Sequence, residues 1–257
     1  ICTDKTGTLT TNEMTIRKLF VNGMIIDVTG VGYETKGQFL YKNKLAGVDE
    51  LELLLRIGAL NNNAELKDSN LIGDPTEGSL IVSAAKAGLS KEELEIEYPR
   101  IDEIEFTSER KMMTSVHKHN GEKIANVKGA PEVVLSLCNY IDINGKTKKL
   151  TTEMKKEILE INKQFADSAL RVLGFAYKTI VTDKDPESNL IFVGLQGMID
   201  PPREEVKTAI EECKKAGIRV IMITGDHEIT AKAVAKEIGL SGKAITGQRL
   251  DEIKNLE

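Results

Sequence analysis

The chain has 257 residues, of which 40% are hydrophobic and 29% charged, a balance that suits one large globular domain or two modest ones. The formal net charge of −5 and the lack of Trp argue against a basic or aromatic surface that binds nucleic acid. The three cysteines lie far apart without the spacing of a zinc site, and no apolar stretch approaches the roughly 18 residues that cross a membrane.

The first 60 residues predict a loop, a hairpin and a helix. The loop is residues 4–8 (Asp-Lys-Thr-Gly-Thr), which are typical of a tight turn after a strand. Residues 15–28 are expected to form a hairpin, because Asn22-Gly23 suits a turn that needs positive φ. The apolar period over 49–60 predicts a helix that begins with a capping-box pair, Asp49 and Glu52.

The next segment carries a clear helix start. Asp74 can cap the helix, Pro75 suits its first position and Glu77 lies at its third, so a helix is expected to run to about Ala87 and to end at Gly88. A second short helix is expected over 90–97.

The middle of the chain is rich in strands. Turns are expected at Asn120-Gly121 and Asn144-Gly145, a short helix begins at Pro131, and a longer helix over 152–168 places Ile158, Ile161 and Phe165 on one side. The predicted strands are 101–106, 112–117, 123–128, 171–180 and 190–198.

The pattern changes at residues 200–203 (Asp-Pro-Pro-Arg). A helix over 204–216, a strand over 218–224 and a helix over about 229–238 follow, which is typical of an α/β domain with a parallel sheet. We therefore expect residues 1–12 and 200–257 to be two pieces of one α/β domain, with residues 13–199 as an α+β insert between them.

Two segments carry residues that suit phosphoryl chemistry. Asp4, at a strand end before a Gly-containing turn, can present a carboxylate oxygen to phosphorus while backbone N–H groups of the turn hold the phosphoryl oxygens. Residues 220–226 form an apolar strand end followed by Thr224-Gly225-Asp226. The Thr224 hydroxyl can donate to a phosphoryl oxygen, and Asp226 can organise a metal or cap the following helix.

The run of residues 4–10, Asp-Lys-Thr-Gly-Thr-Leu-Thr, resembles the phosphorylation motif of the P-type ATPases, a branch of the haloacid-dehalogenase-like superfamily. The downstream Thr-Gly-Asp matches the same family. The resemblance implies that Asp4 takes the phosphoryl group and that the Asp4 carboxylate and the Thr6 carbonyl bind magnesium. The implied catalytic residues are Asp4, Lys5, Thr6 and Thr224.

Position 6 separates two classes of this superfamily. Many of its phosphatases carry a second Asp there, as general acid and base, whereas this chain has Thr6. Without that base the phospho-aspartate is expected to be long-lived, as a pump requires.

The resemblance covers the whole chain and includes a nucleotide site. Residues 106–113 resemble the segment that stacks adenine on an aromatic ring, and residues 128–132 (Lys-Gly-Ala-Pro-Glu) resemble the nucleotide-domain lysine motif. By the same resemblance, a glutamate contacts the adenine amine and an arginine reaches the phosphates. The nucleotide-binding residues it implies are Glu77, Phe106, Lys111, Met113, Lys128, Gly129, Arg171, Thr224, Gly225 and Asp226.

Plainer interpretations of these residues stay open. Asp4 can be a turn residue, Thr224-Gly225-Asp226 an ordinary strand-to-helix turn, and Phe106 a core aromatic at a strand end. Glu77 also suits the first turn of its helix, and Arg171 can belong to a surface ion pair.

The implied fold is a partial haloacid-dehalogenase-like (Rossmann-type) phosphorylation domain with a large nucleotide-binding insert on an antiparallel sheet. The implied reaction is transfer of phosphate from ATP to Asp4, then hydrolysis, with magnesium as cofactor and coupled to cation transport. Residues 28–33 and 73–78 resemble bacterial calcium-pump relatives, so calcium is the expected ion.

The implied location is the cytosolic face of a membrane, and the implied partners are an actuator domain, transmembrane helices and the rest of the phosphorylation domain. The chain has no initiator Met, and the family's later magnesium-binding segment does not occur before Glu257. We therefore expect a monomeric fragment that binds ATP but phosphorylates Asp4 poorly. Alternatives are a non-catalytic nucleotide-binding module and a soluble phosphatase.

Overall fold

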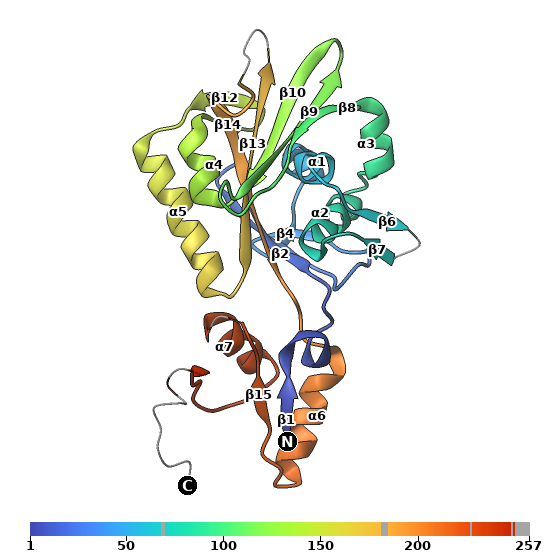
Figure 1. Ribbon diagram of the computed structural model, residues 1–257, viewed down its shortest axis with the longest axis vertical. Coiled ribbons are helices and arrows are strands. Elements are labelled where there is room, and N and C mark those ends of the chain that lie inside the picture. Colours follow the sequence, from blue (N-terminus) through green and yellow to red (C-terminus); the bar gives the residue numbers. More distant parts are fainter. Residues whose placement is uncertain (68–69, 181–184, 227, 248, 250–257) are drawn as a thin grey trace. The chain divides into compact units, whose positions relative to one another are not determined.

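The computed structural model describes residues 1–67, 70–180, 185–226, 228–247 and 249. By its internal contacts the chain divides into two units, which are described separately (Figure 1). Unit 1 comprises Ile1–Glu13, Asp167–Ala169 and the chain from Asp200 onward, and unit 2 comprises Met14–Ala166 and Leu170–Ile199. In the part of the chain that the structure describes, no helix is both long and apolar enough to span a membrane.

Unit 1 contains a parallel strand pair and two helices. Strand β1 (Cys2–Asp4) pairs with β15 (Ile221–Ile223), so that Asp4 lies opposite Ile223. Helices α6 (Glu204–Lys215) and α7 (Glu228–Glu237) flank β15 in sequence, which confirms the predicted helix, strand and helix with a shorter strand. The small apolar core consists of Leu9, Val206, Ile210 and Ile238.

Unit 2 is built on a sheet to which the described residues contribute eleven strands. The order β5-β4-β3-β2-β14-β13-β10-β9-β8 is antiparallel, β11 pairs parallel with β14, and β12 pairs with β11. The α/β composition and the large antiparallel sheet expected from the sequence are confirmed. The strands are β2 (Thr15–Val21), β3 (Met24–Val28), β4 (Phe39–Tyr41), β5 (Lys44–Leu45), β8 (Arg100–Ile104), β9 (Met112–His119), β10 (Glu122–Gly129), β11 (Cys138–Ile143), β12 (Lys146–Lys149), β13 (Arg171–Ile180) and β14 (Leu190–Ile199).

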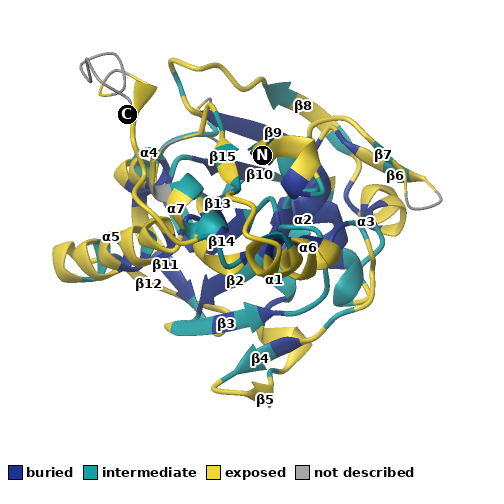
Figure 2. Ribbon diagram, turned by 90° about the horizontal axis from the view of Figure 1, so that it is seen from below, coloured by how far each residue is buried: buried dark blue, intermediate teal, exposed yellow. Residues whose placement is uncertain are grey.

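Helices cover both faces of this sheet (Figure 1). Alternating side chains along a strand point to opposite faces. Leu19 accordingly packs in the cluster that includes α1 (Glu52–Leu60) and α2 (Pro75–Lys86), whereas Phe20 packs in the cluster that includes α4 (Pro131–Leu137) and α5 (Thr152–Asp167). In Figure 2 the central strands β9 and β10 are mostly buried, and the outer side of α5 is exposed.

Local signals explain most element boundaries. Asn22 and Asn120 have φ of 54° and 48° in the predicted hairpin turns. Asp74 caps α2 as predicted, by accepting from the N–H groups of Thr76 and Glu77. The short helix expected over 90–97 is α3 (Lys91–Glu97), and Ser90 caps it.

The predicted capping box of the first helix is wrong. Val48–Glu50 form a 3₁₀ turn, and α1 begins three residues later than predicted, with the buried Leu51 at its N-cap and no side-chain cap. Asp49 therefore lies within the 3₁₀ turn and does not cap α1. The short strands β4, β5, β6 (Glu65–Lys67) and β7 (Asn70–Ile72) were also not expected, because stretches of two or three residues leave no period to detect.

Candidate functional site

The candidate phosphorylation residues lie in unit 1, at the carboxyl ends of β1 and β15. Because the two strands are parallel, Asp4 and Thr224 follow at the same edge. Asp4 is exposed and extended (φ −76°, ψ 152°), and the chain then turns through Gly7, whose φ of 73° favours glycine. Thr6 is exposed, and Thr224 accepts a hydrogen bond from the N–H of Asp226 at 3.1 Å.

Lys5 is buried beside two carboxylates. It is only 4% exposed, and its Nζ lies 2.7 Å from Asp226 Oδ2 and 3.9 Å from Asp200 Oδ2. A buried ammonium needs such partners, since an unpaired one is strongly destabilising. The Lys5 side chain therefore holds Asp226 and the Asp4 loop together, while the Asp4 carboxylate stays open to solvent.

Asp200 is a site residue that the sequence marked only as the start of the change of pattern at residues 200–203. Its Oδ2 accepts a hydrogen bond from the Thr10 hydroxyl at 2.6 Å, which joins the end of the Asp4 loop to the start of the second piece of unit 1. Its Oδ1 is buried and has no hydrogen-bond partner among the described residues. The pairing of Asp200 with Lys5 joins residues 195 positions apart and has no local signature.

The expected magnesium ligands are the Asp4 carboxylate and the Thr6 carbonyl. The described residues contain no group of three or more His, Cys, Asp or Glu that would enclose a metal ion. Two protein oxygens suit magnesium, which retains water and substrate phosphate oxygens as its other ligands. The exposed Asp4 and the unpartnered Asp200 Oδ1 are of the right chemistry for such an ion.

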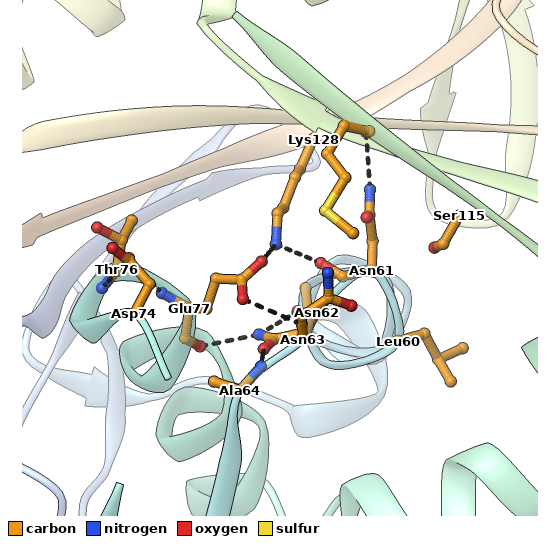
Figure 3. Close-up of polar contacts among 12 residues, drawn as sticks. Leu60, Asn61, Asn62, Asn63, Ala64, Asp74, Thr76, Glu77, Ser115 and Lys128 are labelled. Carbon is orange, nitrogen blue, oxygen red and sulfur yellow. Dashed lines mark hydrogen bonds and ion pairs between the residues drawn. The ribbon is translucent and has the colours of Figure 1, made fainter. Parts of the chain in front are cut away.

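Seven of the ten nucleotide residues predicted from the sequence lie in unit 2, and two of these seven form an ion pair; Thr224, Gly225 and Asp226 lie in unit 1. Lys128 Nζ, on β10, donates to Glu77 Oε1, on α2, at 2.5 Å, and to the carbonyl oxygen of Asn61 at 2.5 Å (Figure 3). The second oxygen of Glu77 accepts from the N–H of Asn63 at 3.0 Å. Lys128 is 7% exposed, and burial lowers its pKa, an effect that the nearby charge of Glu77 opposes.

Residues 60–64, at the C-terminal end of α1, support this pair and were missed by sequence reasoning. The Asn61 side chain donates to the carbonyls of Met113 and Asn126, and the Asn62 side chain donates to Gly58 and Glu77 (Figure 3). The last carbonyls of a helix have no partners within it and favour cations. Lys91, Arg100 and Lys128 all donate to carbonyls of this segment. The only local signal was the unusual Asn61-Asn62-Asn63 run directly after an apolar helix.

Two further predicted residues lie near this cluster. The Arg171 guanidinium is exposed and donates to the Thr76 hydroxyl at 2.9 Å, next in sequence to Glu77, and it forms no ion pair with a described carboxylate. Lys111 is exposed with φ 54°, and its carbonyl accepts from the N–H of Ala130 at 2.9 Å, two residues after Lys128.

The remaining predicted residues of unit 2, Phe106, Met113 and Gly129, differ in how far they are open to a ligand. Phe106 lies in the loop after β8 and is 59% exposed, so it is not a core aromatic. Met113 is 2% exposed and pairs with Lys128 across the strands, so its side chain has no open face for a ligand. A Cβ at Gly129 would lie 2.5 Å from the Lys111 carbonyl oxygen, so this glycine is required by the chain's own backbone.

Comparisons with known proteins show what the chain is similar to. The family model for the P-type ATPase cytoplasmic domain N matches residues 50–205. The chain is 42% identical, over its whole length, to a calcium-transporting ATPase of Bacillus subtilis (strain 168), of which it covers 31%. It is also 40% identical to the cation-transporting ATPase pma1 of Synechocystis, with 97% of the chain and 30% of that protein covered.

A more distant relative is the sodium/potassium-transporting ATPase subunit alpha-1 of Oreochromis mossambicus. It is 36% identical over 93% of the chain, which covers 26% of that protein. The chain therefore spans less than a third of the length of each of these three relatives.

Proposed function

The chain belongs to the P-type ATPases, and we propose on this basis that it is the ATP-binding and phosphorylation region of an ATP-driven cation pump. The transported ion is calcium in this proposal, since several relatives, including the one from Bacillus subtilis, are named calcium-transporting ATPases. The remaining parts of the pump are an actuator domain and membrane helices. The region itself lies at the cytosolic face.

The observation that carries the proposal is the contrast between Asp4 and Lys5. The Asp4 carboxylate is exposed at a strand end, while the adjacent Lys5 is buried in a carboxylate pair that fixes the loop. A carboxylate is a weak nucleophile, but phosphoryl transfer depends mainly on position and charge neutralisation. A fixed loop with an open carboxylate meets the first of these requirements.

The proposed reaction begins with attack of an Asp4 oxygen on the γ-phosphorus of ATP. A bond forms between this oxygen and phosphorus, the bond to the β-phosphate bridging oxygen breaks, and ADP leaves. Thr224 donates its hydroxyl hydrogen to a phosphoryl oxygen, and the N–H groups of the Asp4 loop hold the others. The Asp4 carboxylate and the Thr6 carbonyl would hold magnesium, which would supply positive charge to offset that of the phosphate.

Water attacks the resulting acyl phosphate slowly, because position 6 is Thr6 and not a second Asp. A general base beside the nucleophile contributes a large rate factor in related chemistry, and its absence prolongs the intermediate. A long-lived aspartyl phosphate suits a pump, which changes conformation between phosphorylation and hydrolysis. This residue also makes the soluble phosphatase the weaker alternative.

Unit 2 holds the nucleotide in this proposal. The exposed Phe106 offers its ring to adenine, and Glu77, which accepts a hydrogen bond from Lys128, also accepts from the adenine amine. Lys111 and Arg171, both exposed, supply positive charge for the phosphates. These roles are supported by the residues' exposure and by the contacts of Glu77.

The test of the phosphorylation step uses the complete pump that contains this chain. It is incubated with γ-labelled ATP and magnesium, quenched in acid, and mapped by mass spectrometry after borohydride reduction, which converts an acyl phosphate of Asp4 to homoserine. We expect the label on Asp4 and its loss in Asp4→Asn, with retention in Asp102→Asn, an exposed carboxylate of β8. A label that persists in Asp4→Asn contradicts the proposal.

A further inference from the structure

Unit 2 contains a polar cavity that the proposed nucleotide site does not use. Its volume is about 520 Å³, within the range of small-molecule sites. Ile124 and Asn126 of β10 and Tyr177 of β13 line it on the sheet, and the N-terminal part of α1 lines it from above. None of the predicted nucleotide residues lines this cavity.

The rim of the cavity is tied together by one side chain. Asn22, in the β2–β3 turn, donates to the carbonyl oxygen of Glu50 at 2.9 Å and accepts from the N–H of Asn144 at 2.8 Å. These three residues come from three separate turns, and all three line the cavity. The opening is therefore held in shape before any ligand enters, which lowers the entropy that binding must overcome.

The lining is strongly acidic. Asp49, Glu50, Glu52 and Asp142 contribute four carboxylates, and Arg56 contributes the one cation of the lining. Arg56 is already engaged, because its Nε lies 2.7 Å from Glu52 Oε1 and its guanidinium carbon lies 4.6 Å from the Tyr98 ring centroid. Three carboxylates thus remain without a basic partner within the lining.

Asp142 is the carboxylate placed deepest. It is 7% exposed, and its Oδ1 accepts from the N–H of Gly145 at 2.9 Å. Among the described residues, the one hydrogen-bond partner of its Oδ2 is the Tyr177 hydroxyl, at 3.5 Å, which is too long for a strong hydrogen bond. A buried carboxylate oxygen with so weak a partner favours a cationic donor.

Asn126 provides an independent observation. It is 4% exposed, and it shares a face of β10 with Ile124, on the side that packs against α1. Its backbone carbonyl accepts from Asn61, but among the described residues its side-chain amide forms no hydrogen bond. Buried side-chain amides are normally hydrogen-bonded, so this one is available to a ligand in the cavity.

We propose that this cavity binds a small organic cation of the polyamine class. One ammonium group of the ligand pairs with Asp142 Oδ2, an N–H group donates to the Asn126 amide oxygen, and a second ammonium lies at the Asp49 and Glu50 rim. The alkyl chain between them covers Ile124 and Tyr177. The ligand site is separate from the proposed nucleotide site and does not depend on that assignment.

The test is a calorimetric titration of spermidine into the 257-residue chain. No nucleotide is present, because ATP itself binds polyamines. We expect saturable binding with one site, about tenfold weaker in Asp142→Asn, which keeps the oxygen that accepts from Gly145 but loses the charge. Glu50→Gln, whose side chain is exposed, is a second variant expected to weaken binding severalfold without a folding risk.

Two controls distinguish binding of spermidine in this cavity from nonspecific attraction to the protein. Glu65→Gln removes an exposed carboxylate elsewhere in unit 2 and has the same net charge as Asp142→Asn, so binding is expected to be unchanged. 1,8-Octanediol, a neutral chain of similar length, is expected not to bind. Three results would each overturn the proposal. Spermidine binding could weaken as much in Glu65→Gln as in Asp142→Asn, it could disappear in sodium chloride of the same ionic strength as the spermidine solution, or the parent could give no saturable heat.

Discussion

Lys128 Nζ and Glu77 Oε1 lie 2.5 Å apart, although β10 and α2 are separated by some fifty positions in the chain. Both groups are largely buried, with side-chain exposures of 8% and 17%. The pair explains why a lysine can be stable between a sheet and a helix, and it keeps Glu77 as a hydrogen-bond acceptor. In the proposed function this acceptor recognises the adenine amine.

Replacing Glu77 by Gln tests this role in recognition. A glutamine has almost the same shape but can donate as well as accept, so selectivity for adenine over guanine nucleotides should narrow. We expect the ratio of ATP to GTP affinity to fall about tenfold in calorimetric titrations. The free energy of unfolding should also fall, by about 3 kcal/mol, since Lys128 loses its buried partner. Glu93→Gln, an exposed carboxylate of α3, should change neither quantity, and an unaltered nucleotide ratio in Glu77→Gln would refute the role.

The second prediction is that the Phe106 ring stacks on the base of ATP but contributes little to the stability of the fold. Because its ring is 59% exposed, Phe106→Ala should leave the free energy of unfolding within about 0.5 kcal/mol. Loss of a base-stacking ring should weaken ATP binding about tenfold. Phe106→Tyr should restore affinity, whereas Ile96→Ala, a change at a residue 82% exposed, should not affect it. Equal ATP affinity in parent and Phe106→Ala would show that the ring does not stack on the base.

Most of the fold of unit 2 could be predicted because its signals are local. Asp74 and Pro75 predict the start of α2, and the Asn-Gly pairs predict the hairpin turns. The start of α1 could not be placed, because Asp49 and Glu52 match a capping box, whereas in the structure Val48–Glu50 form a 3₁₀ turn and the buried Leu51 is the N-cap. The pairing of β1 with β15 could not be predicted from local signals, because it joins residues more than 200 positions apart in the chain.

The candidate site likewise contains residues that could be predicted from local motifs and residues that could not. Asp4 and Thr224 stand in recognisable motifs, and the parallel strand pair places both at one edge. The supporting residues Asn61 and Asp200 have no motif, since their partners come from distant strands and loops. The buried pairing of Lys128 was also not visible, because sequence alone shows a lysine before a turn and not the helix that covers it.

Lys86 predicts a pH dependence of stability. Burial lowers its pKa from 10.5 to about 8, and its Nζ donates to the carbonyl oxygen of Thr29 at 2.8 Å. Between about pH 8 and 10.5 the unfolded chain therefore binds a proton that the folded chain does not, so this group makes stability rise with pH in that window. Below about pH 8 the charged Lys86 opposes folding to its full extent.

The measurement for Lys86 is urea unfolding at pH 7, 9 and 10.5. The rise in the free energy of unfolding with pH that Lys86 causes in the parent should be absent in Lys86→Met. Lys148 is an exposed lysine of β12, and Lys148→Met should keep the parent's dependence of this free energy on pH. A parental slope in Lys86→Met would mean that other groups cause the pH dependence.

The central claim is that unit 2 binds ATP at the Lys128 and Glu77 pair. Its most direct test is a calorimetric titration of ATP into the chain, into Lys128→Ala and into Lys178→Ala. Lys178 is a matched control, because it is a lysine of the adjacent strand β13 that is also buried, with 9% exposure. We predict saturable binding by the parent and by Lys178→Ala, and at least tenfold weaker binding by a folded Lys128→Ala. Equal affinity in all three proteins, or no binding by the folded parent, would contradict the claim.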